Sequence, residues 1–347
     1  MAKTNIIDYV ENEFRTFEEY PFTEVDSLVL SEFSYLQLDG MVGGFEVEYR
    51  LTKVKDLFCA EYFGDLFPDN NLKEDNRALL FAMAASPRFR NLELRYYVNE
   101  TDVEMEKQFS AVTVVLGEDT VYIAFRGTDS TIVGLKEDFN MAYMSPVPSQ
   151  ISARSYVERV AKEWKGNLLL GGHSKGGNLA VYAALTVKEE IQNRILSIYS
   201  HDGPGLNEDM IAVNPYESMA DRIHKTLPQS SVVGMLLEQQ EEYTVVESDT
   251  IGILQHNPFS WVVEDGEFHQ LEQLTRGAQK IDGALDKWLK GLSREEREQF
   301  VEVLFSVLSA GEATTISELN ENWKSEVLSM LKAIRGIRFE KRENGKK

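Results

Sequence analysis

The chain has 347 residues, and its 36 lysine and arginine residues face 57 aspartate and glutamate residues, which gives a formal net charge of −21. This charge repels nucleic-acid phosphates and anionic lipid headgroups, so we expect no nucleic-acid partner. No stretch approaches the roughly 20 apolar residues of a membrane-spanning helix, and no basic segment followed by an apolar core opens the sequence. The composition therefore predicts a cytoplasmic protein without a transmembrane segment.

The first hundred residues combine acidic and aromatic residues with apolar side chains at helical spacing. The spacing is clear in DSLVLSEFSYLQL, residues 26–38, and again in NRALLFAMAASPRFRNLELRYY, residues 76–97. We expect residues 1–100 to form an N-terminal helical layer. Cys59, the one cysteine, cannot form an internal disulfide, and its apolar neighbours indicate a buried packing thiol.

The central part of the chain alternates strand-like and helix-like segments. A hairpin is predicted by two β-rich runs, FSAVTVVLG and VYIAFRG, which the turn residues EDT separate. Helical periodicity follows in ARSYVERVAKEWKG and in NLAVYAALTVKEEIQN, and short apolar strands are predicted at NLLLGG and RILSIYSHDG. This alternation predicts an α/β fold with a mostly parallel central sheet and helices on both faces, which we assign to residues 101–265.

The last part of the chain, from FHQLEQLTRG to the charged end KRENGKK, has almost wholly helical periodicity. We expect residues 266–347 to form a C-terminal helical region that packs on the α/β core. The sequence has no internal repeat, low-complexity tract or Pro/Ser-rich linker. The three regions are therefore distinguished by their periodicity.

A glycine-rich stretch, LLLGGHSKGGNLAVYAAL, surrounds Ser174 between a short apolar strand and an alanine-rich helix. The pentapeptide GHSKG is a G-x-S-x-G motif in the context of a nucleophile elbow. A serine on so tight a turn has strained backbone angles, and Gly172 and Gly176 lie too close to their surroundings to carry a Cβ. The helix N-terminus also offers free N–H groups to a developing oxyanion. The alternative is a glycine-rich turn that only packs closely or binds a phosphate.

A serine hydroxyl becomes a good nucleophile when a base takes its proton, and histidine has a suitable pKa at neutral pH. Among the five histidines, His256 follows a β-rich run well after Ser174, as the α/β-hydrolase order of serine, acid and histidine requires. We therefore select His256 as the base. The other histidines have no HExxH or CxxC companion, so we expect no metal site.

The four remaining histidines are assigned other positions. His173 adjoins the serine, with its ring expected to point away from it, and His201 ends the following strand. His224 and His269 lie in helical-looking surroundings, which is typical of surface or structural residues.

A second motif lies upstream of the serine. Arg126-Gly127-Thr128 ends the β-rich run in VYIAFRGTDSTIVGLKEDF, where an α/β-hydrolase has the loop that supplies its other oxyanion donor. This stretch resembles the FRGT/S…D segment of class 3 (fungal-type) lipases. More closely, HSKGGNLAVYAA, SHDGPG, PQSSVVGMLLE and QHNPFSW together resemble the bacterial Mbeg1-like family over most of residues 25–265. The resemblance implies an α/β-hydrolase fold and a catalytic class, but no substrate.

The lipase pattern implies roles for several residues. Thr128 would offer its backbone N–H, with or without its hydroxyl, to the oxyanion, and the backbone N–H of Lys175 would offer the second bond. Asp138 would hold the Thr128 loop, and Arg126 would support the turn. The side chain of Lys175 is expected in solvent at the helix start. The H…PFSW segment is similar to that around the lipase histidine and supports His256.

The acid is where the sequence departs from the lipase pattern. The segment LPQSSVVGMLL carries Ser230 and Ser231 and no carboxylate. Two candidates remain, Asp202 at the end of the strand after the elbow helix and Asp249 shortly before His256. Because α/β active sites assemble at the carboxyl ends of strands, we favour Asp202. If Asp202 only shapes its turn, the site is a Ser-His dyad or is impaired.

These residues together predict a serine hydrolase of the lipase or esterase type, which cleaves a carboxylic ester through an acyl-enzyme on Ser174. The expected substrate is a small-molecule or lipid ester, and no cofactor is implied. One alternative is a catalytically impaired pseudo-hydrolase that acts as a binding or interaction module, which the Ser230-Ser231 pair favours. Another is an acyltransferase with the same residues. The sequence carries no signal for the oligomeric state or the acyl-chain length.

Overall fold

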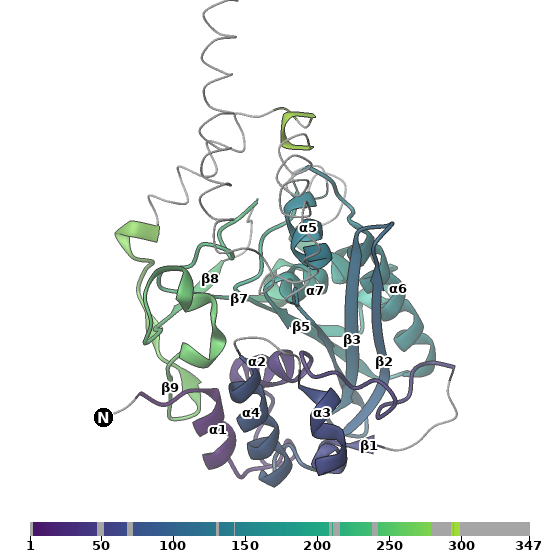
Figure 1. Cartoon of the computed structure of the whole chain (residues 1–347), viewed down its shortest axis with the longest axis vertical. Coiled ribbons are helices and arrows are strands. Elements are labelled where there is room, and N and C mark those ends of the chain that lie inside the picture. Colours follow the sequence, from purple (N-terminus) through teal and green to yellow (C-terminus); the bar gives the residue numbers. More distant parts are fainter. Residues whose placement is uncertain are drawn as a thin grey trace, which may run out of the picture.

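The computed structural model describes residues 3–46, 52–67, 72–129, 132–141, 143–207, 210, 216–237, 242–278, 293 and 295–298. Within them, a nine-stranded sheet has the order β1-β2-β3-β4-β5-β6-β7-β8-β11 (Figure 1). Its strands are β1 (Thr52–Lys53), β2 (Glu93–Asp102), β3 (Lys107–Val115), β4 (Thr120–Phe125), β5 (Asn167–His173), β6 (Ile195–His201), β7 (Ile223–Pro228), β8 (Tyr243–Val246) and β11 (Gln270–Leu271). A separate ribbon pairs β9 (Val263–Glu264) with β10 (Glu267–Phe268).

The helices are α1 (Ile6–Asn12), α2 (Glu24–Phe33), α3 (Phe63–Leu66), α4 (Lys73–Ala85), α5 (Ile132–Asn140), α6 (Pro148–Glu163), α7 (Lys175–Thr186) and α8 (Glu189–Gln192). Two short 3₁₀ turns, η5 (Gly252–His256) and η6 (Pro258–Ser260), follow β8. No helix in this described part has the length and hydropathy of a membrane span.

The direction of the strands divides the sheet into two parts. Strands β1 to β4 form an antiparallel meander, which includes the predicted hairpin of β3 and β4. Strands β4 to β8 run parallel, and β11 pairs antiparallel with β8. The prediction of an α/β fold with a mostly parallel central sheet is confirmed.

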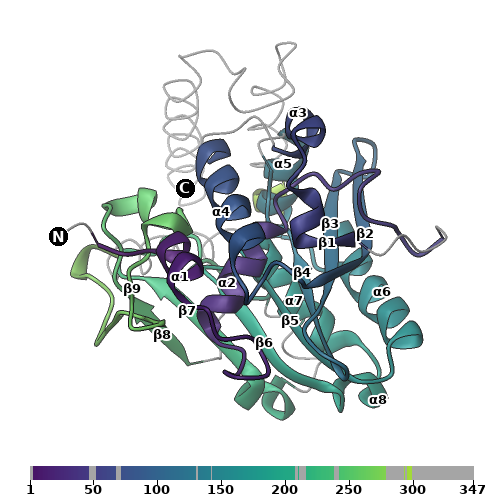
Figure 2. The ribbon, with the colours of Figure 1, turned by 90° about the horizontal axis from the view of Figure 1, so that it is seen from below.

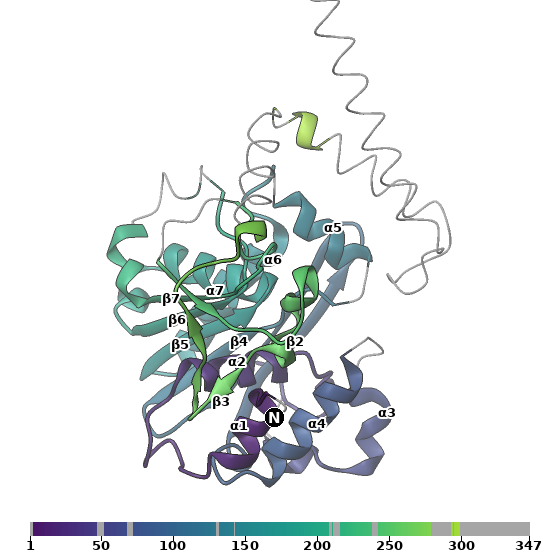
Figure 3. The same cartoon turned by 90° about the vertical axis from the view of Figure 1, so that its left-hand side faces the viewer.

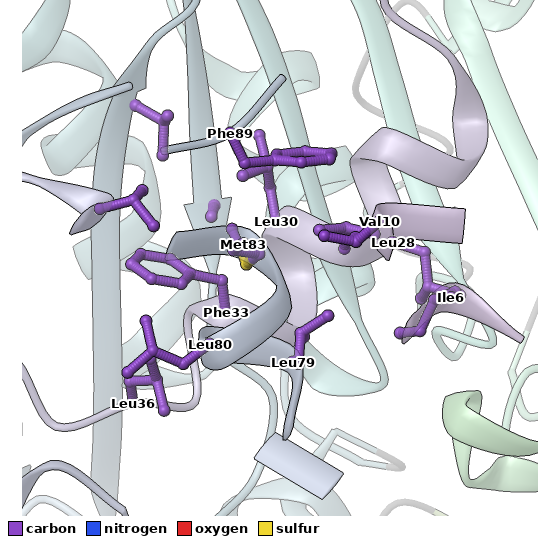
Figure 4. Close-up of a cluster of buried hydrophobic side chains, with 14 of the residues drawn as sticks. Ile6, Val10, Leu28, Leu30, Phe33, Leu36, Leu79, Leu80, Met83 and Phe89 are labelled. Atoms are coloured by element: carbon purple, nitrogen blue, oxygen red, sulfur yellow. The ribbon is translucent and has the colours of Figure 1, made fainter. Parts of the chain in front are cut away.

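Helices cover both faces of the sheet (Figures 2 and 3). Helices α1, α2 and α4 lie on one face, and α6 and α7 lie on the other. Because side chains alternate along a strand, Leu169 of β5 joins the core under α2, whereas Leu168 and Leu170 join the core under α7. Figure 4 shows apolar side chains that α1, α2, α4 and their flanking residues contribute to the first core: Ile6, Val10, Leu28, Leu30, Phe33, Leu36, Leu79, Leu80, Met83 and Phe89.

Two runs that were expected to be helical contain strands. Helix α4 ends at Ala85, since the residue before Pro87 is held in an extended conformation, and residues 93–102 form β2. Pairing with β3 outweighs the helical spacing of this segment. Residues 267–271 likewise form β10 and β11. The rest of the predicted C-terminal helical region lies almost wholly outside the described residues.

A buried ion pair fastens the N-terminal helices together. Arg88 Nη2 lies 2.6 Å from Asp26 Oδ2 on α2, and neither side chain is exposed. The Tyr9 hydroxyl of α1 donates to Asp26 Oδ1 at 2.9 Å. By contrast, Cys59, which was expected to be buried, is half-buried.

We predict that Arg88→Met lowers the free energy of unfolding by about 3–5 kcal/mol, because it leaves the Asp26 charge buried without its partner. Urea denaturation of the purified variant measures the effect. Arg15→Met is the control, since Arg15 pairs with Glu13 at the surface and its loss is expected to leave stability nearly unchanged. Equal stability of the two variants would contradict the prediction.

Candidate active site

The functional candidates gather where consecutive parallel strands end. Thr128 follows β4, Ser174 follows β5, Asp202 follows β6, Ser231 follows β7, and His256 lies beyond β8. The carboxyl ends of neighbouring parallel strands meet at one edge of a sheet, which is where α/β proteins build their sites. The topology therefore brings together residues that are far apart in the sequence.

Ser174 occupies the turn between β5 and α7 with φ 58° and ψ −130°. This left-handed backbone is strained for a residue with a side chain, and such strain persists only where the surroundings impose it. The surroundings do so here, because the Ser174 N–H donates to the His201 carbonyl at 2.9 Å and the Ser174 carbonyl accepts from Gly177 at 3.0 Å. The turn has the geometry of the predicted elbow.

The glycines of the motif sit where no side chain fits. A Cβ on Gly172 would lie 2.3 Å from the Gly176 carbonyl carbon, and a Cβ on Gly176 would lie 2.1 Å from the Phe125 carbonyl oxygen. The predicted close approaches are therefore present. Gly127 was not selected from the sequence for its packing. A Cβ added at this position would also lie too close to the backbone, 2.6 Å from the His173 carbonyl oxygen.

We predict that Gly176→Ala lowers the free energy of unfolding by about 1–3 kcal/mol or more, since the obstructing atom belongs to the backbone of β4 and cannot rotate away. Thermal or urea denaturation measures the change. Gly117→Ala is the matched control, because a Cβ there meets nothing within 4 Å. Similar stability of both variants would show that the elbow tolerates a Cβ.

His256 lies between the serine and an aspartate. Its Nε2 is 3.0 Å from Ser174 Oγ, and its Nδ1 is 2.6 Å from Asp202 Oδ2. With the proton on Nδ1, the imidazole donates to the carboxylate and accepts from the serine hydroxyl. The His256 ring is partly open to solvent, whereas the Asp202 carboxylate is buried. The structure thus brings together the three residues that the sequence proposed.

Asp202 is held by the segment that lacks the expected carboxylate. Its Oδ1 accepts a hydrogen bond from the Ser231 hydroxyl and another from the Gly234 N–H at 3.1 Å. Ser231, which follows β7, therefore donates a hydrogen bond to Asp202, which follows β6. The alternative acid, Asp249, has an exposed side chain and is not brought to His256; its N–H donates to the Ser260 carbonyl at 2.9 Å.

His173, whose ring was expected to point away from Ser174, packs this ring against that of His256, with centroids 4.6 Å apart. His173 Nδ1 lies 3.0 Å from the buried carboxylate of Glu32 on α2. Burial opposes the charged form, but Glu32 outweighs it and raises the pKa of His173 above its ordinary value. No sequence signal pointed to Glu32, because its partner is distant in the chain.

The other three histidines lie in or beside strands, which corrects the helical surroundings expected for His224 and His269. His201 is fully buried at the end of β6, and burial lowers its pKa to about 3, so its ring is neutral when it contacts the Ser27 hydroxyl at 2.9 Å. His224 stacks on Tyr199, and His269 pairs with Glu264 at the surface. None of these contacts involves Ser174.

The two residues whose backbone N–H groups the sequence proposed as oxyanion donors follow the ends of the neighbouring parallel strands β5 and β4. One is Lys175, the first residue of α7, whose N–H has no partner within the helix. The other is Thr128, whose hydroxyl donates to Asp138 Oδ2. Arg126 is buried behind this loop, where its Nη2 donates to Asn99 Oδ1 at 3.0 Å and lies 3.5 Å from Asp129.

The side chain of Lys175, expected in solvent, is instead buried, with 1% of its surface exposed. Its ammonium donates to Gln108 and Glu137. A lysine at the start of a helix is usually solvated, which is why solvent exposure was expected. The carboxylate that pairs with Lys175 lies on α5, far from the elbow in the sequence, so the local sequence gives no sign of it.

We predict that Thr128→Val reduces kcat by about tenfold to a hundredfold, because the hydroxyl that anchors the loop to Asp138 is lost. Thr128→Ser keeps the hydroxyl and is expected to be mild. Steady-state hydrolysis of a chromogenic ester measures both. Full activity in Thr128→Val would restrict the role of this residue to its backbone N–H.

The parallel strands and the strand-to-helix elbow at the end of β5 are those of an α/β-hydrolase fold. A sequence model of the Mbeg1-like family matches residues 83–306, and the chain belongs to that family. The match begins after α2, so Glu32 lies outside it. Among curated proteins, none matches this sequence.

Solved lipase structures are similar to this chain. The native lipase–propeptide complex of Rhizomucor miehei is 19% identical with a TM-score of 0.36, and the match covers 45% of this chain and 57% of that one. Lipase II from Rhizopus niveus is 19% identical with a TM-score of 0.32, covering 45% and 67%. The M37 lipase is 17% identical with a TM-score of 0.38, covering 62% and 70%. The chain thus spans little more than half of the Rhizomucor protein.

Proposed function

We propose that this protein is a serine hydrolase that cleaves a carboxylic ester through an acyl-enzyme on Ser174. One observation carries the proposal: His256 lies 3.0 Å from Ser174 Oγ and 2.6 Å from the buried carboxylate of Asp202. This is the spacing that general-base activation of a serine requires.

In the proposed reaction, His256 Nε2 takes the proton of Ser174 as Oγ attacks the ester carbonyl, and the imidazolium then gives that proton to the leaving alcohol. Asp202 holds the Nδ1 proton in place and stabilises the imidazolium by its charge. Water, activated by the same histidine, attacks the acyl carbon in the second half of the reaction and releases the acid and Ser174.

The developing oxyanion would lie between the N–H of Lys175 and the N–H of Thr128. The Thr128 hydroxyl carries one proton, and that proton is donated to Asp138. We therefore assign oxyanion binding to the backbone of Thr128 and the anchoring of its loop to the hydroxyl. Arg126 and the glycines of the elbow support this arrangement without contact with substrate.

The proposed substrate is a small-molecule or lipid ester. The main argument for an impaired pseudo-hydrolase was the absence of a carboxylate at Ser230 and Ser231. The bond from Ser231 to Asp202 weakens that argument, because the carboxylate arrives from the neighbouring strand. The cytoplasmic location and the three regions divided at residues 100 and 265 remain proposals from the sequence.

The test is a stopped-flow measurement of p-nitrophenyl butyrate hydrolysis by the purified full chain. We expect a burst of p-nitrophenol followed by slower turnover, and mass spectrometry of the quenched reaction should place a butyryl group on Ser174. Acylation that is resolved by an added alcohol and not by water would indicate an acyltransferase. A protein that is folded and never acylated would contradict the proposal and favour the pseudo-hydrolase.

A further inference from the structure

A lysine directly after the nucleophile brings its charge into the interior beneath the elbow. Lys175 is the first residue of α7, and 1% of its side chain is exposed. Its Nζ donates to the Gln108 carbonyl at 2.9 Å, to Gln108 Oε1 at 2.8 Å and to Glu137 Oε2 at 3.1 Å. An ammonium has three protons, so all of them are used.

The carboxylate of Glu137, which pairs with the Lys175 ammonium, is itself held by two backbone N–H groups. Glu137 lies on α5 with no exposed side-chain surface. Its Oε2 accepts from the Gln108 N–H at 3.0 Å, and its Oε1 accepts from the Ser149 N–H at 2.8 Å at the start of α6. Lys175 therefore ties the elbow to β3, α5 and α6 through one buried ion pair.

The next residue on α5 connects this pair to the oxyanion loop. Asp138 accepts the hydroxyl of Thr128, and its other oxygen, Oδ1, lies 4.0 Å from Lys175 Nζ. Burial raises the pKa of Asp138 to about 6, and the positive charge of Lys175 opposes a larger rise. With a pKa of about 6, Asp138 is ionised at neutral pH, and both Lys175 and the hydrogen bond from Thr128 favour this form. An ionised Asp138 can only accept from Thr128.

Stability alone does not explain so costly an arrangement. A buried ion pair often contributes little against well-packed apolar side chains of similar size, because both charges lose their hydration. The position of the pair is more informative. The pair joins Lys175, whose backbone N–H is one proposed oxyanion donor, to α5. Helix α5 also carries Asp138, which anchors the Thr128 loop that supplies the other proposed donor.

Building on the proposed hydrolase function, we propose that the Lys175 side chain is a positioning residue, which fixes the Thr128 loop against the elbow through Glu137 and Asp138. Its backbone N–H binds the oxyanion, and its ammonium sets the separation between that N–H and the one of Thr128. The side chain itself does not touch the substrate.

The test compares Lys175→Met with Lys136→Met, a lysine on α5 that pairs with Glu106 near the surface. With p-nitrophenyl butyrate as probe, Lys175→Met is expected to lower kcat by about tenfold to a hundredfold and leave KM within about twofold. Lys136→Met is expected to match the wild type. A kcat of Lys175→Met equal to that of Lys136→Met would overturn the proposal.

Two further measurements separate positioning from general support of the fold. Combined with Thr128→Val, Lys175→Met should cost less than the product of the two single losses, since both act on one loop. Its activity should also fall more than that of the wild type between about pH 8 and about pH 6, because Asp138 then lacks its cation while Glu137 and Asp129 still oppose its charge. The proposal would be overturned if the losses of the two single variants multiplied in the double variant and the pH profile of Lys175→Met ran parallel to that of the wild type.

If Lys175→Met does not fold, Lys175→Gln replaces it, because the amide can donate to Gln108 and Glu137 without a charge. Unfolding of both variants would make Lys175 a structural residue and would also overturn the proposal. The wild type is assayed first for acylation of Ser174. An inert wild type would reject the hydrolase function, whereas an active wild type with an unaffected Lys175→Met would reject only the role of Lys175.

Discussion

Ser174→Ala is expected to abolish covalent labelling by a fluorophosphonate and to remove ester hydrolysis. The probe forms its bond with an activated serine oxygen, and Ser174 Oγ is the oxygen that lies 3.0 Å from His256 Nε2. His256→Ala should be nearly as damaging, because a nucleophile and its base act as a unit and the loss of either costs about as much as the loss of both. Labelling is read by gel fluorescence and by mass of the intact protein.

The control for Ser174→Ala is Ser230→Ala. The Ser230 hydroxyl lies outside the triad and is 3.0 Å from the Thr275 hydroxyl. We expect full labelling of this variant. Circular dichroism checks that Ser174→Ala is folded, which we expect because the backbone bonds that hold the turn do not involve the hydroxyl. Labelling that survives in folded Ser174→Ala would place the reactive residue elsewhere and would remove the basis of the proposed function.

The elbow and the acid show how much of this site local sequence can predict. Ser174 was identified because its strain requires glycines two positions away on either side, and that requirement is written within five residues. His256 and Asp202 required the chain order of a fold and the rule that sites form at strand ends. The distances between the three side chains lie beyond any local pattern, since they depend on the register of β5 and β6 and on where the turn after β8 places His256.

The contacts that could not be predicted from the sequence join residues from segments that are far apart in the chain. Lys175 was expected in solvent because its neighbours in the chain give no sign of Glu137, which α5 brings to it. Glu32 comes from the N-terminal layer and reaches His173 only after α2 packs on the sheet. Residues 93–97 were expected to be helical because pairing with β3 is a tertiary effect that the local spacing of apolar residues does not contain.

Asp202→Asn is expected to lower kcat by orders of magnitude, about 10⁴ in the best-studied triad, with little change in substrate binding. The asparagine can present its amide N–H₂ to His256 Nδ1, which would favour the tautomer with the proton on Nε2. That tautomer cannot accept the proton of Ser174. The same substitution also removes the charge that stabilises the imidazolium 2.6 Å away.

Two matched variants make the Asp202 prediction specific. Asp249→Asn changes the other candidate acid, whose side chain is exposed, and is expected to retain wild-type kcat. Ser231→Ala removes one of the donors to Asp202 Oδ1 and leaves the Gly234 N–H in place, so we expect a loss well below that of Asp202→Asn. A large effect of Asp249→Asn, or wild-type turnover in Asp202→Asn, would refute the assignment. A graded series, with Asp202→Asn the most damaging and Ser231→Ala intermediate, would mean that the carboxylate works through its orientation as well as its charge.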